Sequence, residues 1–122
     1  MLKRYLPAIT IMLFIFLLSS LPGATVDAVG LGKESYHING HFILFFLLCL
    51  AFYRGTQRDL LRSLLFSLCY AFLDEFHQAF VPGRNSGWFD IFVDSTGILL
   101  AGVILWRFYP HLPKKLKNWL KK

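Results

Sequence analysis

The stretch "DEFHQAFVPGRNSGWFDIFVDSTG", residues 74–97, lies between two long apolar segments and decides how the chain folds. Pro82 and Gly83 near its centre fit a turn, because proline lacks a backbone donor and glycine accepts turn dihedrals. Charged and polar residues occupy both sides of that turn. The stretch therefore predicts two helices joined by a short connection, with ionisable groups at the helix ends that meet there.

The chain around this stretch is strongly apolar. Its 122 residues allow one domain, and a content of 56% hydrophobic residues is too apolar for a small core that faces water. A membrane span needs about 17 to 25 mostly apolar residues. We therefore predict a single all-α domain, residues 1–122, forming an integral membrane bundle of four transmembrane helices at about 5–21, 38–53, 60–80 and 90–108.

The first span has a second interpretation. Lys3 and Arg4 precede it and "PGATVDA" follows it, as in a cleaved secretory signal. A run of 17 apolar residues is long for such a signal, which favours a retained anchor. Both interpretations leave the other three spans in the same orientation.

The positive charges predict that orientation. With the N-terminus in the cytoplasm, only Lys33 and Arg84 are basic on the outer side, and eleven basic residues lie on the inner side. The inner set is Lys3, Arg4, Arg54, Arg58, Arg62, Arg107, Lys114, Lys115, Lys117, Lys121 and Lys122. This asymmetry predicts cytoplasmic N- and C-termini in a multi-pass protein of the cytoplasmic membrane. The net charge of +6 then indicates anionic lipid at the cytoplasmic face, with no need for a nucleic acid partner.

The basic cytoplasmic tail, residues 109–122, predicts a short amphipathic helix. Leu112, Leu116, Trp119 and Leu120 share one helical face, with lysines between them. A frayed, solvated tail is the alternative. The two cysteines lie within predicted spans and receive no functional assignment, because they form no metal or redox motif.

Helical spacing gathers polar residues at the outer ends of three spans. Asp74, Glu75, His77 and Gln78 form a broad polar face, with His77 at its edge. A small rotation of the helix would exchange Asp74 and Glu75, so either can be the one that faces inward. The second span adds His37 and His41, four residues apart, at its outer end.

The last span carries a stripe of Asp90, Asp94, Gly97 and Ala101. Small residues let membrane helices approach closely, so Gly97 and Ala101 are predicted to pack against a neighbour. The two carboxylates would then face the interior of the bundle. Individual members of the polar set have simpler explanations as helix caps or interhelical hydrogen bonds.

Ionisable residues within a bilayer mark functional sites by default, because each costs about 2.5 to 3.5 kcal/mol at the centre of a span. Arg84 either clamps Glu75 or Asp90, or presents its guanidinium to a phosphate or carboxylate on a ligand. The candidate functional or ligand-binding cluster is His41, Asp74, Glu75, Gln78, Arg84, Asp90 and Asp94.

The same residues resemble the signature of the VanZ-like family of small bacterial membrane proteins. The matching positions are Glu75, Gln78, Pro82, Gly83, Arg84, Asp90, Asp94 and Gly97, with His41 and Phe42 at the start of an earlier helix. Members often carry a lysine just before that histidine, and this chain has none there. The resemblance implies a role in the cell envelope and in resistance to the glycopeptide teicoplanin, without naming a reaction.

Two functions from different classes follow. One is a non-enzymatic envelope protein whose outer polar site holds a cell-wall precursor or a glycopeptide. The other is a membrane enzyme acting on a lipid-linked phosphate or glycan, with Asp74 or Glu75 as general base, His41 as proton shuttle and Arg84 stabilising negative charge.

Other chemistries have less support from the sequence. His41, Glu75 and Asp90 would suit zinc or manganese, but their spread over three helices does not predict a metal, and we assign neither a metal nor another cofactor. A proton-linked transporter would also use such residues, although the inner halves of the spans offer no continuous polar path. The sequence does not determine the oligomeric state.

Overall fold

The computed structural model describes residues 2–122, and within that range it contains helices and no strand, which confirms the all-α prediction. The long helices are α1 (Leu2–Ser19), α3 (Glu34–Gly55), α4 (Leu60–Gln78) and α5 (Trp88–Arg107). Three short elements complete the chain: α2 (Gly23–Ala28), the 3-10 helix η1 (Tyr109–His111) and α6 (Lys114–Lys121).

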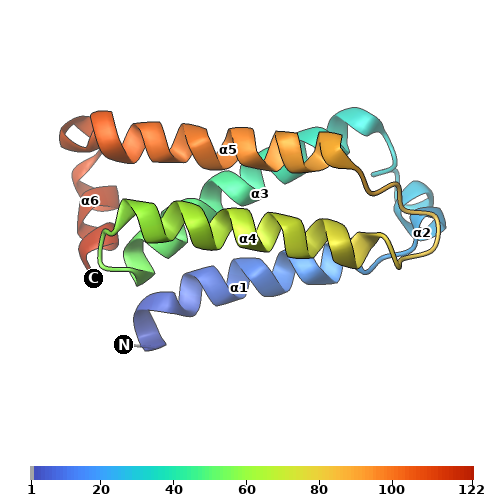
Figure 1. Cartoon of the computed structure of the whole chain (residues 1–122), viewed down its shortest axis with the longest axis horizontal. Coiled ribbons are helices and arrows are strands. Elements are labelled where there is room, and N and C mark those ends of the chain that lie inside the picture. The colour runs from blue at the N-terminus through green and yellow to red at the C-terminus, as the bar shows by residue number, and fades with distance from the viewer. Residues whose placement is uncertain (1) are drawn as a thin grey trace.

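The four long helices form an elongated bundle in which α3 packs against α1, α4 and α5 (Figure 1). Both termini, the α3–α4 connection and α6 lie at one end, which we call the termini end (Figure 1). The helix α2 and the α4–α5 connection lie at the opposite end, which we call the site end (Figure 1). Successive long helices run in opposite directions between these two ends, since short connections join antiparallel neighbours.

Local chemistry explains where the helices begin and end. Asp59 caps α4, because its side chain accepts a hydrogen bond of 3.0 Å from the backbone N–H of Arg62. The helix α3 begins four residues before the predicted span, and Glu34 in its first turn suits the positive end of a helix dipole. Apolarity alone marks only the part of α3 that lies in lipid, so the predicted boundary fell at residue 38.

Three helices, α1, α3 and α5, are long and apolar enough to cross a membrane. The helix α4, which corresponds to the third predicted span at 60–80, is not among them, since Arg62, Asp74 and Glu75 all fall within it. Composition therefore supports three spans rather than clearly four. The polar residues of α4 are covered by its neighbours, whereas Leu65 and Leu73 are exposed on its outer side.

The surface and the core of the bundle are both apolar. Phe45, Leu48, Ile98 and Ala101 are fully or almost fully buried at the contact of α3 with α5. Large apolar side chains on the outside are more than half exposed, among them Leu13, Phe14, Leu17, Ile43, Phe72, Phe92 and Leu99. Such a surface suits lipid rather than water, and together with the three apolar helices it indicates a membrane protein.

The helix α6 folds back on the termini end of α3. Leu120 is almost completely buried, and the Trp119 ring lies 4.9 Å from the guanidinium carbon of Arg54 in a cation–π contact. The apolar face of α6, from which an interfacial helix was predicted, thus packs against α3. Most of its lysines are exposed, so the outer face of α6 is basic.

Candidate functional site

The site end is held together by a backbone contact between two loops. The N–H of Gly23, at the start of α2, donates a hydrogen bond of 3.0 Å to the carbonyl of Pro82. A side chain at Gly23 would collide with the backbone of Gly83, which itself adopts a positive φ of 74°. The turn that the sequence predicts at Pro82 and Gly83 is therefore also the anchor of α2.

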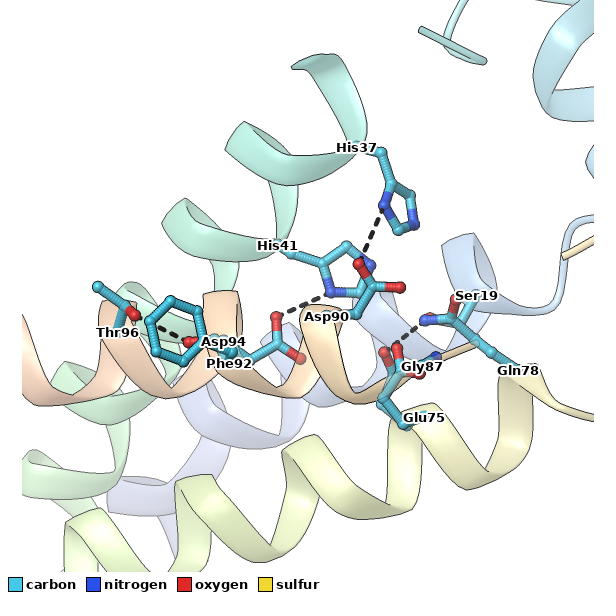
Figure 2. A network of polar contacts seen from close by, with 11 residues as sticks. Ser19, His37, His41, Glu75, Gln78, Gly87, Asp90, Phe92, Asp94 and Thr96 are labelled. Atoms are coloured by element: carbon cyan, nitrogen blue, oxygen red, sulfur yellow. Dashed lines mark hydrogen bonds and ion pairs between the residues drawn. The ribbon is translucent and has the colours of Figure 1, made fainter. Parts of the chain in front are cut away.

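His41 and Asp94 form the innermost pair of the candidate cluster. The Nδ1 atom of His41 lies 2.8 Å from Oδ1 of Asp94, which has no solvent exposure (Figure 2). Because a carboxylate only accepts hydrogen bonds, His41 donates through Nδ1 and keeps Nε2 as an acceptor on the other side of its ring. Asp94 thus fixes both the orientation and the tautomer of His41.

Gly97 lets these two residues meet. A Cβ atom at position 97 would lie 2.5 Å from the carbonyl oxygen of Phe42 and 3.3 Å from the backbone nitrogen of Phe46. The backbones of α3 and α5 therefore touch one turn below the pair. Ala101, next along the same stripe, is fully buried.

A second histidine and carboxylate lie one helical turn closer to the surface. His37 Nδ1 is 3.7 Å from Asp90 Oδ1, and both side chains are partly exposed (Figure 2). The rings of His37 and His41 are 4.4 Å apart at their centres. The spacing of four residues on α3 and on α5 thus produces two stacked histidine–carboxylate pairs.

Asp74 and Gln78 join α4 to α1. The Nε2 atom of Gln78 donates to Oδ2 of Asp74 at 2.9 Å and to the hydroxyl of Ser19 at 3.3 Å. Gln78 is completely buried, and Asp74 is almost completely so. Figure 2 shows this group beside the end of α1. Ser19 was missed by the sequence analysis, and its place at the end of an apolar run was the only signal for it.

Glu75, the residue after Asp74 on α4, holds the beginning of α5. Its Oε2 atom accepts a hydrogen bond of 2.7 Å from the backbone N–H of Gly87, the residue that precedes α5. A carboxylate at this place also suits the positive end of the α5 dipole. Asp74 and Glu75 are both buried, so both side chains face the interior of the bundle.

Arg84 is the arginine of the predicted cluster, and its charge is not paired with a carboxylate of residues 2–122. Among residues 2–122, no carboxylate lies within ion-pair distance of its guanidinium group, so it clamps neither Glu75 nor Asp90. Its Nε atom is buried and makes no hydrogen bond within the chain. The sequence allowed two roles for Arg84: a clamp on Glu75 or Asp90, or a group that binds a ligand. The structure is compatible with the second role.

Two adjoining cavities reach this part of the molecule. An apolar cavity of about 220 Å³ lies between the end of α1, α2 and the first half of α3, where His41 is part of its wall. A polar cavity of about 570 Å³ lies between α2, the start of α3 and the α4–α5 connection, where Asp90 is part of its wall. The residues common to both cavities are Val26, Leu31, His37 and Arg84.

His77 is directed away from the two histidine–carboxylate pairs. Its Nε2 atom lies 2.9 Å from the hydroxyl of Ser20, and its ring stacks on Phe16 with centres 4.6 Å apart. These contacts give it a packing role between α1 and α4. His37 and Gly40, by contrast, line the apolar cavity although the predicted cluster did not include them.

Several polar atoms of the cluster can still accept or donate hydrogen bonds. Buried atoms without a partner in the chain are Glu75 Oε1, Gln78 Oε1, Arg84 Nε and Asp94 Oδ2 at the site end, with Arg54 Nε and Tyr109 Oη elsewhere. Within the described residues, no group of three or more His, Cys, Asp or Glu side chains is arranged to hold a metal ion.

The comparisons with known proteins give one family. A sequence profile of the VanZ/LLP1 family matches residues 5–109, which include most of α1, all of α2 to α5 and every residue of the predicted cluster. No curated protein and no solved structure gives a match. Because the matched range covers most of the chain and contains the signature residues, this protein belongs to the VanZ/LLP1 family.

Proposed function

We propose that this chain is a multi-pass protein of the bacterial cytoplasmic membrane whose site end faces outward and holds an envelope component, a cell-wall precursor or a glycopeptide. In this way it contributes to teicoplanin resistance. The orientation is supported by the eleven basic residues that the fold gathers toward the termini end, since positive loops stay in the cytoplasm. Family membership supports the envelope.

The observation that carries this proposal is Arg84. An arginine at a membrane boundary that has no acidic partner is a ready acceptor site for an anionic group, because its planar fork binds phosphate or carboxylate in two parallel hydrogen bonds. His37 and Asp90 lie along the same polar cavity. These groups would recognise the anionic part of the ligand together with neighbouring polar atoms.

The test is a growth assay under teicoplanin with a deletion strain complemented by variants. Glu75→Gln, Arg84→Ala and Asp90→Asn should each increase susceptibility to the level of the deletion strain, because each removes a charge from the site and leaves the helices intact. His77→Asn is the matched control, since His77 lies on the far side of α4 and should retain resistance. Protein levels in the membrane are measured in parallel. Unchanged susceptibility in all three charge variants would refute the functional cluster.

The orientation has its own test. In a chain with Cys49→Ala and Cys69→Ala, a cysteine introduced by Ser86→Cys in the α4–α5 connection should react with a membrane-impermeant maleimide in intact cells. Ser86 is exposed, which makes it suitable for labelling. A cysteine introduced by Arg58→Cys, in the α3–α4 connection, should react only after the membrane is permeabilised. The reverse pattern would invert the proposed topology.

The pair of His41 and Asp94 favours a second candidate, a membrane enzyme that acts on a lipid-linked phosphate or glycan. A histidine whose Nδ1 is held by a buried carboxylate at 2.8 Å is arranged as a general base through Nε2. Asp74 and Glu75, named as bases from the sequence, are instead occupied by Gln78 and Gly87. Lipid-precursor analysis separates the candidates, because catalysis changes the species present and binding leaves them unchanged.

A further inference from the structure

The junction between the two cavities has the chemical character of an amphiphile. On one side lie Ile15, Leu18 and Leu21 of α1 and Leu44 of α3, which are apolar. On the other side lie polar groups, including Asn85, Ser86 and Asp90. Arg84 and His37 belong to both walls, so the positive charge of Arg84 lies where apolar and polar surroundings meet.

The apolar cavity has room for part of one chain. A water molecule occupies about 30 Å³ in the liquid, so a cavity of about 220 Å³ holds roughly seven groups of that size. A methylene group is of similar size, so the cavity accepts roughly the first seven carbons of one hydrocarbon chain. Gly40 contributes to this space, because a Cβ atom built on it has no neighbour within 4 Å.

The polar cavity suits a neutral, hydroxyl-rich group beyond the anion. Asp27 and Glu34 are exposed at its rim, and Asp90 is closer to the junction. Carboxylates accept hydrogen bonds from hydroxyl groups and repel further negative charge. An anion is therefore favoured beside the guanidinium group of Arg84, with hydroxyls preferred farther out.

We propose that the ligand is a lipid with a single hydrocarbon chain, a phosphate and a hydroxyl-rich head group. The chain enters the apolar cavity past Gly40, the phosphate binds Arg84 at the junction, and the head group occupies the polar cavity. This inference rests on the proposed function and gives its ligand a chemical class. A polyprenyl phosphate that carries a sugar has this chemistry.

The test measures binding to the full chain in detergent micelles by native mass spectrometry. The probes are farnesyl phosphate, farnesol and inorganic phosphate, with dioleoyl phosphatidylglycerol as a lipid of two chains. Farnesyl phosphate should bind at least about tenfold more tightly than each other probe, because chain and phosphate are both recognised. This comparison uses the wild-type protein and so does not depend on any variant folding.

Two variants place the probe within the molecule. Gly40→Leu should remove the advantage of farnesyl phosphate over inorganic phosphate, because the new side chain fills the apolar cavity. Asn39→Leu is the matched control, since it adds the same side chain at an exposed neighbouring position of α3 and should bind like wild type. Arg84→Ala should weaken the binding of both phosphate compounds and leave farnesol unaffected.

Each contrary result contradicts a particular part of the proposal. Equal binding of farnesol would refute recognition of the phosphate, and equal binding of inorganic phosphate would refute recognition of the chain. Tighter binding of phosphatidylglycerol would refute the single chain. If farnesyl phosphate binds as expected but the charge variants keep full teicoplanin resistance, the ligand class stands and the proposed role in resistance fails.

Discussion

Gly97→Ala should destabilise the protein by about 3 kcal/mol, at the upper end of what overpacking costs, although it adds a single methyl group. The new Cβ atom would lie 2.5 Å from the carbonyl oxygen of Phe42, and a backbone atom cannot move aside as a side chain can. To relieve the collision, α5 must separate from α3. That movement also lengthens the contact of His41 with Asp94.

The control for this variant is Gly102→Ala on the same helix. A Cβ atom there would lie 2.9 Å from Cδ2 of Leu64, which is the end of a flexible side chain. Both substitutions gain the same helix propensity, so their difference reports packing alone. The free energy of unfolding, measured by titration with sodium dodecyl sulfate in mixed micelles, should be close to wild type for Gly102→Ala. Equal losses in the two variants would contradict the close contact of α3 with α5.

His41→Leu should cost about 3 to 5 kcal/mol, because it leaves the fully buried carboxylate of Asp94 without its partner. Asp94→Val should cost less, about 1 to 3 kcal/mol, since the group left unpaired is then a neutral imidazole N–H. The double variant should recover most of the loss, because an apolar pair replaces a buried polar pair of similar volume.

Measurements on all three variants separate stability from function. Unfolding in mixed micelles gives the free energies, and the teicoplanin assay gives the activity. The double variant should be stable and still lack activity, because the site has lost its oriented histidine. A loss for His41→Leu no larger than for a surface substitution would show that water already reaches Asp94, and the buried pair would have to be abandoned.

Most of the bundle could be predicted because long apolar runs and turn residues are local signals. Apolarity placed the four long helices within a few residues, and Pro82 with Gly83 marked the turn between the last two. Apolarity also predicted a span at α4, although Arg62, Asp74 and Glu75 fall within this helix and set it apart from the other three.

The site was predictable to the extent that helical periodicity carries it. The stripe of Asp94, Gly97 and Ala101 is buried, as spacing at i, i+3 and i+7 predicts for one face of a helix. The hydrogen-bond partner of each side chain could not be predicted from the sequence, because it depends on how the helices are rotated against each other. Ser19 and the N–H of Gly87 are partners of this kind, and neither belongs to a motif.

The polar face of α4 has a consequence for how the chain enters the membrane during synthesis. Asp74 and Glu75 each raise the cost of inserting an isolated helix, by less than the ~2.5 to 3.5 kcal/mol of a charge at its centre because they lie near its end. Ser19 is already in place when α4 emerges, but Gly87, the partner of Glu75, follows α4 in the chain. In the proposed membrane arrangement, we therefore expect α4 to insert stably only together with the beginning of α5, as one hairpin.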